Sequence, residues 1–188
     1  KRFYPSVLGM LLLMICFFIF PTNFSAVCVR TTNLDPIAVT IIMVALDVVA
    51  ALVGVVFGGM MRRFRLSVKY FAPTFFLLGY LCFATSPSLP SLLVGCLFIG
   101  IANGIGVPYL NTIASIKAGQ DAATTVMPLL SAALYAGQFL SPLVATPLAA
   151  KFFPDNVLGI YWIACAFSVL FLLEVFATRH SQALLPEE

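Results

Sequence analysis

Six stretches of about 20 residues, each composed almost entirely of apolar side chains, follow one another along this 188-residue sequence. A helix needs about 20 apolar residues to cross the ~30 Å hydrocarbon core of a bilayer. The stretches cover residues 6–24, 36–58, 70–85, 89–113, 125–149 and 157–177. The links between them are too short to hold a soluble domain. We therefore predict an all-α membrane protein in which residues 1–188 form a single bundle of six transmembrane helices.

The composition excludes an ordinary soluble domain. Hydrophobic residues make up 62% of the chain and charged residues only 9%, whereas about 25% of a soluble domain is charged. So few charges cannot cover a surface that faces water, so lipid must cover most of it. The net charge of +3 is too small to indicate binding to nucleic acid.

Cysteine and histidine usage argues against a cofactor or an active site. The five cysteines have no CxxC spacing, and four of them lie inside apolar stretches, so we expect neither a metal site nor a disulfide framework. The only histidine, His180, lies in the tail, and no GxSxG or HExxH motif is present, which disfavours an intramembrane enzyme. Because the chain opens on Lys1 without a methionine or a signal-peptide cleavage pattern, we expect a piece of a longer polypeptide.

The basic residues predict the orientation in the membrane. With six crossings, both termini share one side with the second-to-third and fourth-to-fifth links. Eight of the ten basic residues then lie on that side: Lys1, Arg2, Arg62, Arg63, Arg65, Lys69, Lys117 and Arg179. Arg30 and Lys151 lie on the other. Cytoplasmic loops carry the excess of Lys and Arg, so we predict that both termini are cytoplasmic and that Tyr161 and Trp162 belong to an outer aromatic belt.

Two acidic residues fall inside the apolar stretches. Asp47 lies near the middle of the second, where an ionised carboxylate is costly unless it faces a cavity or a partner, so a functional role is the first hypothesis. It would bind protons, coordinate a cation or hold a cationic substrate; the alternative is an Asp that joins two helices by hydrogen bonds. Glu174 is about one turn from the predicted cytoplasmic end near Arg179, and we expect it to snorkel to the interface.

Polar side chains on the fourth and fifth stretches indicate a path for a polar solute. Asn103 and Asn111 share one helix face, and Gln138 and Tyr135 project from the fifth stretch away from a stripe of small residues. The amides suit hydrogen bonds to a solute and, equally, hydrogen bonds between helices. The small residues favour close packing of helices, with Pro142 beside them; the stripe contains Ala133, Gly137, Ser141 and Ala145.

The remaining stretches divide into two kinds. In the first, one face carries Phe20, Asn23 and neighbouring aromatics, which would form a wall of the path or pack against other helices. The third and sixth are rich in Phe and have almost no polar residue near their middle. We therefore predict that four helices surround a polar path and that two face lipid.

Three short motifs stand in order on these stretches. The segment 58–66 matches G-x-x-x-D-R-x-G-R at Gly58 and Arg63 and departs from it at Arg62, Arg65 and Leu66. The segment 100–106 matches R-x-x-Q-G-x-G at Gly104 and Gly106, with Asn103 in place of Gln and Gly100 in place of Arg. The segment 137–146 matches G-x-x-x-G-P-x-x-G-G at Gly137 and Pro142, with Ser141, Ala145 and Thr146 in place of the other glycines.

With this topology, the chain resembles the C-terminal six-helix half of a bacterial-like transporter of the major facilitator superfamily. The resemblance implies two three-helix repeats, location in the plasma membrane (the bacterial inner membrane), and a missing N-terminal half as partner beside the lipid bilayer. It also implies secondary active transport of a small solute by alternating access, coupled to protons or ions. Few fixed charges favour a sugar or a drug as the solute. The absence of the motif Asp and Arg leaves their gating and proton-relay roles without a residue to carry them.

The hypothesis assigns four roles. Solute contacts are expected from Asn103, Asn111, Gln138, Tyr135, Phe20 and Asn23. Asp47 is the candidate for coupling, and Gly58, Arg62, Arg63 and Arg65 would gate the cytoplasmic face, unless these arginines only set the topology. Helix packing is expected at Gly104, Gly106, Gly137, Ser141 and Pro142. A channel or scaffold subunit remains the alternative.

Overall fold

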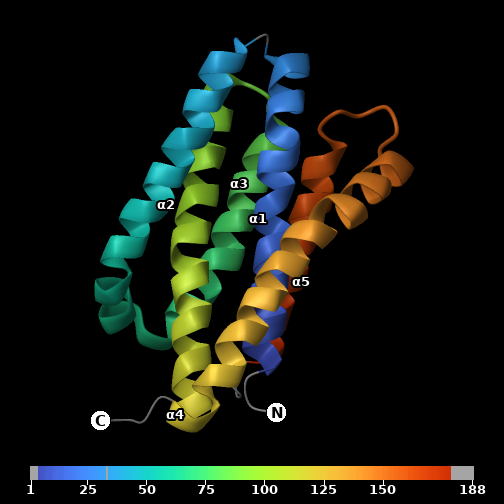
Figure 1. The fold of residues 1–188 in the computed structure, drawn as a ribbon. Helices are drawn as coiled ribbons and strands as arrows, with labels where there is room; N and C mark the ends of the chain where they lie inside the picture. The colour runs from blue at the N-terminus through green and yellow to red at the C-terminus, as the bar shows by residue number, and fades with distance from the viewer. Residues whose placement is uncertain (1–3, 33, 179–188) are drawn as a thin grey trace.

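The computed structural model describes residues 4–32 and 34–178, apart from the side chains of residues 66 and 119–123. Five α-helices and one 3₁₀-helix account for nearly all of this range (Figure 1). They are α1 (Tyr4–Thr31), α2 (Pro36–Phe64), η1 (Arg65–Tyr70), α3 (Phe71–Thr85), α4 (Leu89–Phe152) and α5 (Gly159–Ala177). The all-α prediction is confirmed for this part of the chain.

Six segments of the described helices are long and apolar enough to cross a membrane. They are Tyr4–Thr31, Pro36–Phe64, Ser67–Thr85, Leu89–Ala118, Thr124–Phe152 and Gly159–Ala177. Each contains most or all of one predicted stretch, and several extend a few residues further because the helix continues into flanking polar sequence. These segments indicate an integral, multi-pass membrane protein.

One helix, α4, contains both the fourth and the fifth segments. Its backbone stays helical from Leu89 to Phe152, so the short polar link between these two segments is itself helical. Figure 1 shows the chain reversing direction near the middle of α4, at one end of the bundle. The two parts of α4 therefore run in opposite directions. We refer to residues 89–118 as the first part of α4 and to residues 124–152 as the second part.

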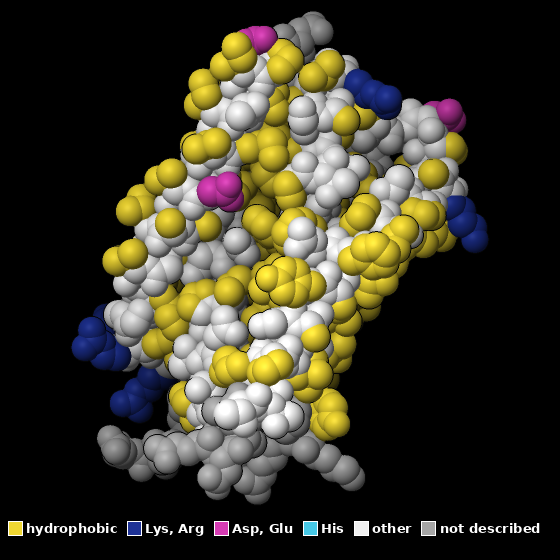
Figure 2. All heavy atoms as spheres, in the orientation of Figure 1, with side chains coloured by type: hydrophobic (Ala, Val, Ile, Leu, Met, Phe, Trp, Pro, Cys, Tyr) yellow, Lys and Arg dark blue, Asp and Glu magenta, His cyan; other side chains and the backbone are white. Residues whose placement is uncertain are grey.

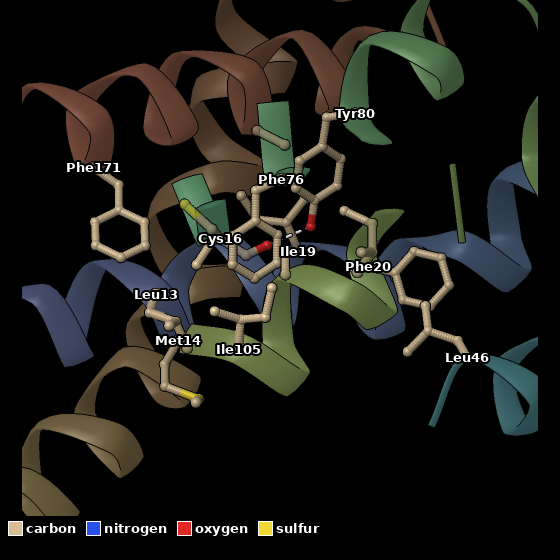
Figure 3. Packing of buried hydrophobic residues seen from close by; sticks show 14 of the residues in the cluster. Leu13, Met14, Cys16, Ile19, Phe20, Leu46, Phe76, Tyr80, Ile105 and Phe171 are labelled. Atoms are coloured by element: carbon tan, nitrogen blue, oxygen red, sulfur yellow. Dashed lines mark hydrogen bonds between the residues drawn. The ribbon is translucent and has the colours of Figure 1, made fainter. Parts of the chain in front are cut away.

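The core lies around α1, which packs against both parts of α4 and against α5. Figure 3 shows apolar side chains from several helices meeting there, with the Tyr80 hydroxyl of α3 donating a hydrogen bond to the carbonyl oxygen of Cys16 in α1. Aromatic rings extend this core: the Phe83 ring lies 5.7 Å from the Phe20 ring and 5.0 Å from the Tyr161 ring, between centroids. Four helices are therefore joined by contacts from residues distant in sequence.

The helices differ in how much of their surface is buried within this bundle. Both α3 and α5 have a buried side, which carries Tyr80 and Tyr161, and they pack against each other. Tyr161 is fully buried, so its predicted place in an outer aromatic belt is wrong, whereas Trp162 is partly exposed. The most exposed helix is α2, where only Val39, Leu46 and Phe57 are buried. Hydropathy could not show this, since the core of a membrane bundle and the lipid around it are equally apolar.

The described basic residues lie at the two ends of the bundle. The end of α2, η1 and the reversal of α4 share one end with the start of α1 and the end of α5 (Figure 1). That end carries Arg62, Arg63, Arg65, Lys69 and Lys117, and the opposite end carries Arg30 and Lys151. Figure 2 shows dark blue side chains at the lower left, at the upper right and at the right edge of this face. Residues 1, 2, 179 and 180 lie outside the described range.

Candidate functional site

Asp47 lies beside a close contact between α2 and the first part of α4. A Cβ on Gly100 would lie 2.9 Å from the carbonyl oxygen of Leu46, and a Cβ on Gly104 would lie 2.5 Å from that of Ala50. No side chain fits between the two backbones at these positions. Asp47 and Asn103 therefore flank one helix contact at the same height in the bundle.

The two sides of this contact differ in chemistry. On one side is an apolar groove of about 270 Å³, to which α2 contributes Ile41, Ala45 and Val49. At 100° per residue, Asp47 lies on the other side of α2 from Ala45, and its side chain is exposed. Figure 2 shows the surface hollowed between α2 and the second part of α4, with an acidic side chain at the edge on α2. Asp47 is the only acidic residue of α2.

Asn103 contributes an acceptor without a partner. It lies between the side of α4 that faces α2 and the side on which Gly106 meets Leu13 of α1. Its Oδ1 atom is buried, and no described residue donates a hydrogen bond to it. Asn111 is half-buried two turns further along the same face. A buried acceptor without a donor is costly, so a donor from a solute or a second protein would satisfy it.

Gln138 and Tyr135 lie on the second part of α4 and point away from α1. Gly137 faces α1, where a Cβ would lie 2.7 Å from the carbonyl oxygen of Leu11. Gln138 is exposed, and 68% of Tyr135 is exposed. Pro142 is half-buried on the same helix. These polar groups, like Asp47, lie on surface that no described residue covers.

Two residues expected to contact solute lie elsewhere. Phe20 is only 1% exposed and packs against Phe24, with ring centroids 4.5 Å apart, inside the aromatic core. The Nδ2 group of Asn23 donates a hydrogen bond to the carbonyl oxygen of Ile19 at 2.9 Å, and its side chain lines a separate groove at the Arg30 end. Neither residue joins Asp47 and Asn103, so both are left out of the candidate site.

The residues expected to gate the chain lie at the end of α2. Gly58 has no atom within 4 Å of the place a Cβ would take, and Arg62, Arg63 and Arg65 are all exposed. Arg65 has a φ of 44°, in the left-handed region that favours glycine. The motif aligned with this segment has glycine at this position.

The structure places Glu174 differently from the sequence prediction. Both of its carboxylate oxygens are buried, with Thr178 and Lys117 as neighbours, so the predicted snorkelling is wrong. A Cβ on Gly9 of α1 would lie 3.7 Å from Oε2, which puts the carboxylate against α1. The Nζ atom of Lys117 is also buried without a hydrogen bond, and the two charges interact electrostatically. The sequence shows this acid inside the apolar stretch 157–177 but not which side of the helix is buried.

The Glu174 side chain also lines a groove. This groove has a volume of about 680 Å³ and lies between the start of α1, the second part of α4 and the end of α5. Its walls are otherwise mostly apolar. In the described part of the chain, no group of three or more His, Cys, Asp or Glu residues could hold a metal ion.

No protein-family model matches the chain, and no curated protein matches its sequence.

Proposed function

We propose that this chain is one six-helix half of a secondary active transporter of the major facilitator type. A second half would cover the open side of α2 and of the second part of α4, and a small solute would bind between the halves. Alternating access would then follow from rocking of one half against the other. The solute would be neutral or amphiphilic, such as a sugar or a drug, since the open side carries few charges. Coupling would use protons or another cation.

The supporting observation is the exposed carboxylate of Asp47 at mid-helix. An ionisable group at the centre of a bilayer costs several kcal/mol unless it faces water or a partner. The side of α2 that carries Ile41, Val48 and Leu52 is aliphatic and can face lipid without this cost. The side that carries Asp47 cannot. A second half that encloses a water-filled path would remove the cost and would give Asn103 and Gln138 a solute to bind.

Thiol labelling in membranes tests this proposal. The five native cysteines are replaced, and single cysteines are introduced as Asp47→Cys, Gln138→Cys and Val48→Cys in the complete membrane protein that contains this chain. A membrane-impermeant sulfonated thiol reagent reacts with thiolate, which forms only where water reaches. We expect labelling at positions 47 and 138 and none at position 48. Labelling of position 48 as fast as position 47, or none at positions 47 and 138, would refute a water-filled path.

Flux measurements separate a carrier from a channel. Proteoliposomes are loaded in turn with neutral sugars and hydrophobic drugs, and both uptake and exchange are followed. A carrier saturates and exchanges external for internal solute. Flux that runs only downhill, does not saturate and shows no exchange would favour the channel reading over a carrier.

A further inference from the structure

A groove with charges of both signs lies at the end of the bundle opposite η1. It has a volume of about 340 Å³ and lies between the last turns of α1, the last turns of α4 and the turn that leads into α5. Its inner wall is apolar and includes Val27, Ala149 and Ile160. Figure 2 shows a basic and an acidic side chain close together on the surface at this end. The proposed function uses none of these residues.

Arg30 and Asp155 supply the two charges. Both line the groove, both are exposed, and neither has an ion-pair partner among the described residues. A guanidinium group binds a phosphate through two parallel hydrogen bonds. A carboxylate binds an ammonium group, which donates three hydrogen bonds. The groove therefore offers one site for a phosphate and another for an ammonium group.

Two amides extend the same complementarity. Asn23 donates its Nδ2 hydrogen to Ile19, which leaves its Oδ1 atom as an acceptor. Asn156 accepts from the backbone N–H of Leu158 at 2.9 Å through Oδ1, which leaves its Nδ2 group as a donor. Asn156 thus adds a donor for a phosphate at the rim, and Asn23, about 10 Å before Arg30 along α1, adds an acceptor deeper in the groove.

The depth of the groove fits the headgroup layer of a bilayer. Arg30 lies in the last turn of α1, and Asp155 lies in the turn before α5. Partly exposed Trp162 begins the next turn of α5, and Trp is typical of the membrane–water interface. The exposed Val157 side chain and the apolar inner wall offer surface for the first part of an acyl chain.

We propose that this groove binds a zwitterionic phospholipid with a primary ammonium headgroup, namely phosphatidylethanolamine. Its phosphate lies on Arg30, and its ammonium group lies on Asp155. Phosphatidylcholine has a quaternary ammonium group that donates no hydrogen bond, and phosphatidylglycerol has no cation, so both bind more weakly. This inference does not depend on transport.

The test measures the melting temperature of the purified protein in detergent with each of the three lipids. Ligand that binds only the folded state raises the melting temperature according to its affinity. We expect phosphatidylethanolamine to give the largest rise. Arg30→Gln should weaken its binding about tenfold or more, because the phosphate loses a charge-assisted pair. Asp155→Asn should reduce the rise to that given by phosphatidylcholine.

Lys151→Gln is the matched control, because Lys151 is an exposed cation at the same end of the bundle that does not line the groove. It should keep the full response to phosphatidylethanolamine. Equal rises with all three lipids, or the same loss in Lys151→Gln as in Arg30→Gln, would overturn the proposal. Water-soluble phosphoethanolamine that binds as tightly as the lipid would also overturn it, since the acyl chain would then contribute nothing.

Discussion

The hydroxyl of Ser141 donates a hydrogen bond to the carbonyl oxygen of Ile15, 3.0 Å away, across the contact between α4 and α1. One turn earlier, Gly137 approaches the backbone of Leu11 so closely that no side chain fits between them. Ser141 is fully buried. These contacts hold the second part of α4 on α1 and thereby position Gln138 and Tyr135 on the open side.

Substitutions at this contact should lower stability in a graded way. Ser141→Ala removes one hydrogen bond and should lower the free energy of unfolding by about 1 kcal/mol. Gly137→Leu forces the two backbones apart and should cost about 1–3 kcal/mol. Gly58→Ala is the control, because nothing lies within 4 Å of the added Cβ. It should be neutral, or stabilising by about 0.5–1 kcal/mol. Unfolding in mixed detergent micelles measures all three, and a Gly137→Leu protein as stable as Gly58→Ala would contradict the assigned contact.

Asp47→Asn should uncouple transport from its driving ion. The amide keeps the size of the side chain but does not release a proton, so accumulation of solute against its gradient should fall to background while exchange of solute continues. Asp35→Asn removes an equally exposed acid before α2 and should leave accumulation unchanged. Proteoliposomes with an imposed proton gradient measure both activities. Normal accumulation by Asp47→Asn would end its assignment to coupling.

Arg65→Gly should stabilise the protein. A non-glycine residue in the left-handed region costs roughly 1–2 kcal/mol, and glycine relieves most of that cost. Arg63→Gly removes the same charge two residues earlier, inside α2, where glycine costs about 1 kcal/mol relative to a good helix former. The two variants should therefore shift the melting temperature in opposite directions. Shifts of the same sign would mean that the lost charge, not the backbone, decides stability at this end.

Hydropathy was sufficient to predict the membrane segments but not the sides on which they pack. The stretch 70–85 carries Tyr80, whose hydroxyl bonds to α1 inside the core. Because lipid and a bundle core are equally apolar, nothing in the composition of that stretch distinguishes the buried side. The same ambiguity misplaced Phe20, which the sequence allowed on either a path or a core.

Two further differences have local causes. The link between the fourth and fifth stretches stays helical; Ala118 lies within it, Ala122 and Ala123 follow it, and alanine has the highest helix propensity. The sequence identified Asp47 and Asn103 but did not show that they lie at the same height in the bundle. That arrangement depends on Gly100 and Gly104, which permit the close contact between α4 and α2, and the sequence does not show which residues of α2 these glycines meet.

Lys117 and Glu174 should show strong coupling in a double-mutant cycle. Both side chains end in buried polar atoms, and each lies in the electrostatic field of the other. Removing one partner leaves an uncompensated buried charge, so Lys117→Met and Glu174→Gln should each lower the free energy of unfolding by about 1–3 kcal/mol.

The double variant removes both charges and should be more stable than the sum of the single effects predicts, by about 1–2 kcal/mol. Lys69 provides the control. It is only 7% exposed, but its Nζ atom lies over the ring of Tyr70, 5.0 Å from the centroid. Lys69→Met combined with Glu174→Gln should therefore be close to additive. Equal coupling in the two cycles would mean that the general field at this end, and not a specific Lys117–Glu174 interaction, stabilises the buried carboxylate.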